Sequence, residues 1–142
     1  MKNSKIEKFA KKLVNAFVNN KIIDPIPIKY TRSMKEAEKL RRICESKIKQ
    51  PIVGFKAAGT GIPVLKKLGE KEPFYASIFK NNVIKSGKSV RVTPYTLGIE
   101  LEVGYLIKKN FFQSKGSINF INIHKYISHM MSAIEVVGYR QK

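Results

Sequence analysis

The pattern of apolar residues changes character at Pro51, and this change constrains the fold class. Before Pro51, apolar side chains recur at helical spacing in two segments, residues 6–18 and 33–48. After Pro51, short apolar runs are separated by glycines and turn residues, which is typical of strands. Helices followed by a β-rich region predict an α+β fold. We therefore expect a single domain, residues 1–142, with a helical part (1–50) and a β-rich part (51–142).

Capping residues mark several of the predicted boundaries. Ser33 is the predicted N-cap of the second helix, with Glu36 three residues later as in a capping box. Pro63 and Gly69 have the positions of the first residue and the terminator of a short helix. The remaining apolar runs predict strands within 52–61, 74–79, 82–92 and 97–109, and a third helix candidate over 121–137 that runs toward a strand.

Composition favours a cytoplasmic protein that does not enter a membrane. The chain has no run of about 18 apolar residues, and its N-terminus lacks the apolar segment of a signal peptide. Cys44 is the one cysteine, so neither a disulfide framework nor a cysteine zinc cluster is expected.

The formal net charge of +18 has two interpretations. It is typical of a basic nucleic-acid-binding module, or it reflects a lysine-rich composition without a specific role. Lysine supplies 23 of the 28 basic residues, and these are spread along the chain without an Arg-rich arm. We therefore expect no specific nucleic-acid partner, and the binding module remains the alternative.

Six of the ten acidic residues form two groups. Glu36, Glu38 and Glu45 lie among basic residues of the second predicted helix and are interpreted as solvated ion pairs. The last 70 residues hold three acidic residues, and all three stand in apolar runs: Glu100, Glu102 and Glu135.

Glu100 and Glu102 are two residues apart in a predicted strand, so their side chains share one face. The apolar residues from Ile99 to Ile107 alternate with them and line the other face, which should be buried. Two like charges on a half-buried strand need compensation by basic side chains, by protonation or by a metal ion. An ordinary solvent-facing strand paired with lysines is one alternative. A divalent cation with Glu135 as a third ligand is the other.

Four stretches in order resemble the family of 2-keto-4-pentenoate hydratases and 4-oxalocrotonate decarboxylases, which is related to the fumarylacetoacetate hydrolases. They are IVGFKAAGTGIPVLKKLG (52–69), EPFYASIF (72–79), IELEVGYLI (99–107) and SAIEVVGYR (132–140). The resemblance implies that the chain forms the first half of a fumarylacetoacetate hydrolase-like fold.

The resemblance also implies a site and a reaction. Glu100, Glu102 and Glu135 would bind Mg²⁺ or Mn²⁺, and Lys56 would be the catalytic lysine of the family's G-x-K motif. The expected reaction is water addition to a 2-hydroxy-dienoate or decarboxylation of a related 2-oxo acid. Such an acid chelates one metal ion, which stabilises the enolate as a Lewis acid.

Other polar residues of the matching stretches have two interpretations each. Thr60 either hydrogen-bonds a substrate carboxylate or stabilises a turn, and Arg140 either contacts substrate or a glutamate or holds its strand in place. His124 and His129 are interpreted as structural residues of the third predicted helix, because their spacing of five does not place them on a shared metal-binding face.

Family members run to about twice this length, so the resemblance covers the N-terminal half alone. One expectation is an enzyme that works with a separately encoded C-terminal half or as a homo-oligomer. The alternative is a truncated, catalytically inactive remnant of the family.

Overall fold

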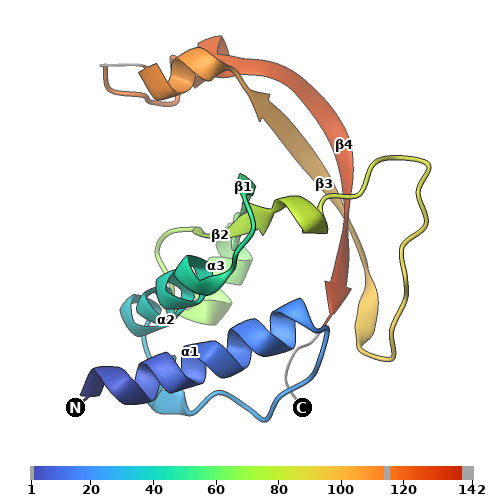
Figure 1. The fold of residues 1–142 in the computed structure, drawn as a ribbon. Helices are drawn as coiled ribbons and strands as arrows, with labels where there is room; N and C mark the ends of the chain where they lie inside the picture. The colour runs from blue at the N-terminus through green and yellow to red at the C-terminus, as the bar shows by residue number, and fades with distance from the viewer. Residues whose placement is uncertain (1, 114–115, 139–142) are drawn as a thin grey trace. The chain divides into compact units, whose positions relative to one another are not determined.

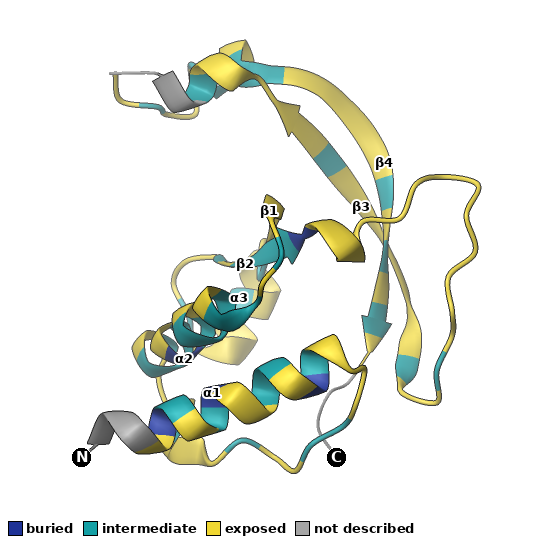
Figure 2. Cartoon of the chain, in the orientation of Figure 1, coloured by how far each residue is buried: buried dark blue, intermediate teal, exposed yellow. Residues whose placement is uncertain are grey.

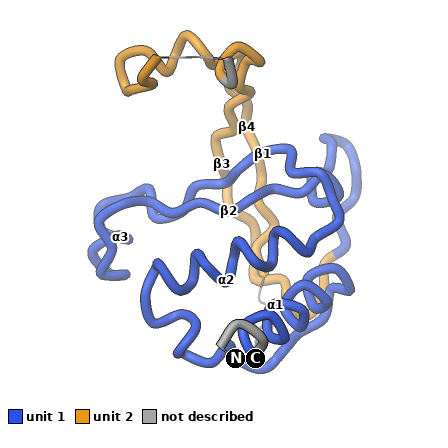
Figure 3. The backbone as a smooth tube through the Cα atoms, turned by 60° about the vertical axis from the view of Figure 1, so that its left-hand side comes forward, with its two compact units in different colours: residues 1–91, 140–142 blue, residues 92–139 orange. Residues whose placement is uncertain are grey.

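The computed structural model describes residues 2–113 and 116–138 and has the expected α+β character. In this part of the chain it contains three α-helices and two small antiparallel sheets (Figure 1). The chain divides into two units, the first running to Arg91 and the second beginning at Val92 (Figure 3). No helix among the described residues has both the length and the apolar character needed to cross a bilayer.

Two helices form the core of the first unit. α1 spans Lys2–Val18 and α2 spans Met34–Lys47, as their apolar periodicity predicts. Ile6 and Ala10 of α1 are buried against Leu40 of α2. At the start of α2 the Glu36 backbone N–H donates to Ser33 Oγ at 3.3 Å, which confirms the predicted N-cap.

A hairpin interrupted by a short helix completes the first unit. β1 (Ile52–Ala58) and β2 (Phe74–Phe79) pair antiparallel, and α3 (Ile62–Leu68) lies between them in the chain. Gly69 caps α3 in the left-handed conformation at φ 71°, as predicted for its terminator. Gly59, at φ 68°, turns the chain out of β1, and an added Cβ there would lie 3.2 Å from both Leu65 and Phe74 side chains.

The glutamate of α2 nearest the hairpin is not a solvated surface charge. Glu45 Oε1 accepts a hydrogen bond from the Ser77 backbone N–H of β2 at 3.2 Å, and Glu45 Oε2 accepts from Arg41 Nη1 at 2.6 Å. The Arg41 guanidinium also lies 4.6 Å from the centre of the Tyr75 ring. The interpretation of Glu45 as a solvated pair was therefore wrong, since its side chain is 17% exposed and joins α2 to the hairpin. Glu36 and Glu38 form the expected i,i+4 pairs.

The second unit is a long two-stranded antiparallel ribbon. β3 spans Thr96–Ile107 and β4 spans Ile127–Gly138. Two 3₁₀ turns, Lys109–Gln113 and Ile123–Tyr126, lie between the strands in the chain.

Two predicted elements were wrong. The helix expected over 121–137 is instead β4, because its apolar run gains backbone hydrogen bonds by pairing with β3 along most of its length. The strand expected over 82–92 is absent, since beyond the 3₁₀ turn Lys80–Asn82 the segment has no ladder partner and turns at Gly87, φ 81°.

The apolar face of the ribbon is exposed, contrary to the expectation that it would be buried (Figure 2). Leu101 is 84% exposed and Ile99 is 65% exposed. On the neighbouring strand Ile134 and Val136, their partners in the ladder, are also exposed. The sequence pattern indicated which residues share this face, but the residues that the structure describes do not cover it.

Candidate metal centre

The register of the ribbon brings the three glutamates of the C-terminal half together. Glu100 lies directly opposite Glu135, and Glu102 lies opposite Ala133. Residues that face each other in a ladder point to the same side of a sheet, so all three carboxylates project from one face. One carboxylate oxygen from each residue lies within 4.8 Å of those of the other two. Glu135 reaches this cluster from a strand rather than from the predicted helix.

The donor set has the chemistry that a hard divalent cation prefers. Oxygen ligands about 2.1 Å from Mg²⁺ lie roughly 3 Å apart when they are neighbours in an octahedron, so carboxylate oxygens within 4.8 Å of one another must move closer together to share one ion. Glu100 and Glu102 are exposed and Glu135 is half-buried, so rotation of the side chains can supply this movement. One oxygen from each carboxylate would leave three positions for water or a chelating acid. Exposed carboxylates also cluster without an ion, so the geometry fits a metal but does not require one.

The alternative, in which lysine side chains neutralise the glutamates of the strand, is not seen for Glu100 or Glu102. Neither Glu100 nor Glu102 takes part in the ion pairs formed among residues 2–113 and 116–138.

Small residues border the carboxylates on their face of the ribbon. Ala133 lies opposite Glu102, and Gly104 follows two residues along β3. A Cβ at Gly104 would meet Met131 Cγ at 3.0 Å, so the Met131 side chain covers that glycine. The cluster therefore has a thioether wall at one end and a short side chain beside Glu102, which leaves access from solvent.

The remaining predicted site residues are not part of this cluster. Lys56 lies in β1 opposite Ala76, and Thr60 lies in the loop between β1 and α3. Both side chains are exposed and belong to the first unit, whereas the glutamates belong to the second. Arg140 lies outside the described residues.

The two histidines do not lie in the long helix that the sequence predicted. His124 lies in a 3₁₀ turn, and His129 lies in β4 with its Nδ1 2.7 Å from Ser128 Oγ. His129 shares the face of Glu135 but stands six residues away, about 20 Å along an extended strand. It therefore cannot join the carboxylates around one ion.

The sequence interpretation missed a second polar feature. It treated lysines as dispersed charge, whereas Lys8, Lys11, Lys12 and Lys21 line one cavity in the first unit. The spacing of the first three residues on α1 is the signal that could have found it.

Comparisons of the chain with protein-family models, with curated proteins and with solved structures find no match. The relation to the hydratase and decarboxylase family therefore stays a prediction based on the quoted motifs.

Proposed function

We propose that the chain is a divalent-metal-dependent hydratase or decarboxylase-like protein that acts on 2-hydroxy-dienoic or 2-oxo acids. The observation that carries this proposal is the convergence of Glu100, Glu102 and Glu135 on one face of the β3–β4 ribbon. Convergence adds support to the motif resemblance, because residues about 35 positions apart along the chain meet where that resemblance implies a metal.

The three carboxylates would hold Mg²⁺ or Mn²⁺, and the metal when bound supplies the Lewis acidity that stabilises an enolate. The glutamates would fix its position while the short side chain of Ala133 leaves room for a planar acid. The family resemblance further assigns Lys56 the task of orienting a substrate carboxylate or carrying a proton, and Thr60 a hydrogen bond to a carboxylate. Both residues belong to the first unit, so the metal site in the second unit is proposed and tested without them.

Metal-dependent stabilisation tests the site. A cation that binds only the folded state raises the free energy of unfolding by about 2.7 kcal/mol when the cation concentration is 100 times the dissociation constant. Unfolding by urea should therefore require more denaturant as Mg²⁺ or Mn²⁺ is added, and Glu102→Gln should abolish the increase. Glu72→Gln is the matched control, because Glu72 is exposed and lies outside the cluster. An unfolding curve that does not move with either metal would refute the site.

Turnover tests the reaction separately from the site. The chain should consume 2-hydroxypenta-2,4-dienoate in the presence of the metal, as followed by ultraviolet absorbance, and Glu102→Gln should stop it. Metal-dependent stabilisation without turnover is the result expected of the catalytically inactive alternative, and also of an enzyme that needs a separately encoded C-terminal half.

A further inference from the structure

A groove lined by lysines runs along α1 in the first unit. It is a depression of about 610 Å³, open to solvent, between α1 and the segment 21–25 that follows the helix. Four of its lining residues are exposed lysines: Lys8, Lys11, Lys12 and Lys21. We call this depression the lysine groove.

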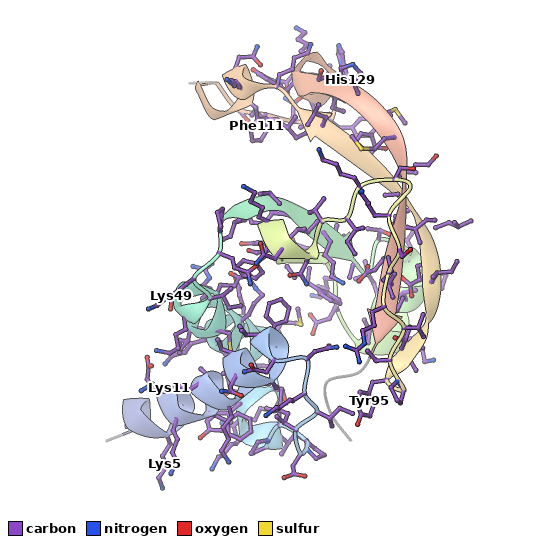
Figure 4. All side chains as sticks on the ribbon, turned by 45° about the vertical axis from the view of Figure 1, so that its right-hand side comes forward. Lys5, Lys11, Lys49, Tyr95, Phe111 and His129 are labelled. Atoms are coloured by element: carbon purple, nitrogen blue, oxygen red, sulfur yellow. The ribbon has the colours of Figure 1, made fainter. Side chains whose placement is uncertain are left out.

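The local structure explains why these lysines gather. Lys8, Lys11 and Lys12 are three and four residues apart, so they share a face of α1. After the helix the chain reverses through Asn20, which has φ 51°. The Lys21 backbone N–H then donates to the Ala16 carbonyl at 2.8 Å, which fixes Lys21 beside the end of α1. Figure 4 shows Lys11 on this helix, with Lys5 about two turns nearer its start.

The charge of the lysine groove is strongly unbalanced. Asp24 is the carboxylate in the lining, against four ammonium groups. None of the four lysines takes part in the ion pairs formed among residues 2–113 and 116–138. Like charges held within one groove raise its positive potential and attract anions.

The apolar lining indicates which part of a ligand the groove contacts. Phe9 is half-buried, and its ring centre lies 5.5 Å from that of Tyr30. Its ring is therefore engaged in internal packing and does not form an exposed platform on which a base could stack. Ammonium groups suit phosphate oxygens as compact point charges.

We propose that the lysine groove binds neighbouring phosphate groups, either of a small oligophosphate or of the backbone of a single-stranded nucleic acid. The binding does not depend on base sequence, because the contacts are to phosphate. It is also separate from the glutamate cluster, which belongs to the second unit.

A pair of charge-matched variants tests the location of binding. The groove variant replaces the four groove lysines by glutamine, whose helix propensity is close to that of lysine. The control variant makes the same change at four exposed lysines away from the groove: Lys66, Lys67, Lys85 and Lys88. Both variants lower the formal charge of +18 by four, so a difference between them reports position rather than net charge.

The probes are inorganic triphosphate, measured by calorimetry, and a labelled oligothymidylate of about ten nucleotides, measured by fluorescence anisotropy. At about 0.1 M monovalent salt each lost lysine–phosphate contact should lower the association constant for the strand roughly fivefold. The salt slope should fall by about 0.7 per contact. The control variant should keep most of the affinity.

The two probes separate the sources of phosphate. Loss of triphosphate binding in the groove variant identifies a small oligophosphate, and loss of oligothymidylate binding alone identifies a strand. If the groove variant fails to fold, as judged by circular dichroism, the double variant Lys8→Gln, Lys12→Gln replaces it. Equal weakening in the groove and control variants for both probes would overturn the proposal.

Discussion

The contact between Glu45 and the β1–β2 hairpin should carry a measurable part of the stability of the first unit. Glu45 accepts from the Ser77 N–H at 3.2 Å and from Arg41 at 2.6 Å. A hydrogen bond to a charged group contributes about 1.5–3 kcal/mol when its loss leaves the partner unsatisfied. The Glu45 and Arg41 side chains are 17% and 21% exposed, so water replaces part of what is lost. We therefore expect Glu45→Ala to lower the free energy of unfolding by about 2 kcal/mol.

Thermal unfolding followed by circular dichroism measures this loss. For a unit of this size, 1 kcal/mol corresponds to about 5 °C, so the midpoint should fall by about 10 °C. Glu38→Ala is the control on the same helix, because the Glu38 side chain is 41% exposed and pairs with arginines at the surface. The reasoning is refuted if Glu45→Ala lowers the midpoint no further than Glu38→Ala.

The pH dependence gives a second measurement of the same contact. Burial acts to raise the pKa of Glu45, but the hydrogen bonds from Ser77 and Arg41 outweigh it and hold the pKa below the ordinary value of 4.5. A carboxyl with a lowered folded-state pKa stabilises the fold above its unfolded pKa and loses that contribution as the pH falls through the folded value. The stability gap between the wild type and Glu45→Gln should therefore narrow below about pH 4.5. A constant gap would contradict the ionic contribution.

Two further measurements test other parts of the first unit. Burial raises the pKa of the Cys44 thiol to about 11. Its alkylation by iodoacetamide at pH 8 should therefore be on the order of 100-fold slower than in the urea-unfolded chain. Equal rates in the two states would contradict this. Gly59→Ala should lower the unfolding midpoint more than Gly87→Ala. Both glycines have positive φ, so both substitutions strain the backbone. A Cβ at Gly59 also meets the Leu65 and Phe74 side chains at 3.2 Å, whereas a Cβ at Gly87 meets nothing within 4 Å. Similar losses at the two positions would show that packing around Gly59 has no role.

The helices of the first unit could be predicted because their signals are local. Ser33, Gly69 and the apolar stripe of α1 each act within a few residues of the element that they define. β4 could not be predicted, because a short apolar run fits a helix or a strand equally well until a partner is known. Its pairing with β3 joins residues from 20 positions apart (Ile107 and Ile127) to 42 positions apart (Thr96 and Gly138), which no local pattern reports.

The glutamate cluster was predictable in part for the same reason. The two-residue spacing of Glu100 and Glu102 fixes their common face without knowledge of the rest of the fold. The census of acidic residues and the family resemblance both indicated Glu135 as a third ligand, but its position opposite Glu100 depends on strand register, which neither of them reports. Glu45 was misinterpreted because its helical neighbours include basic residues, and its actual partner, the Ser77 N–H, lies 32 positions away.

The glutamate cluster and the lysine groove have opposite charges and belong to different units, so each can serve as the control for the other. Glu102→Gln should remove metal-dependent stabilisation while leaving binding of oligothymidylate unchanged. The groove variant should lose phosphate binding while keeping the metal response. Triphosphate itself chelates divalent cations through its oxygens, so its titration must be made without metal. If one variant removed both responses, a general loss of folded structure would explain the result better than two separate sites.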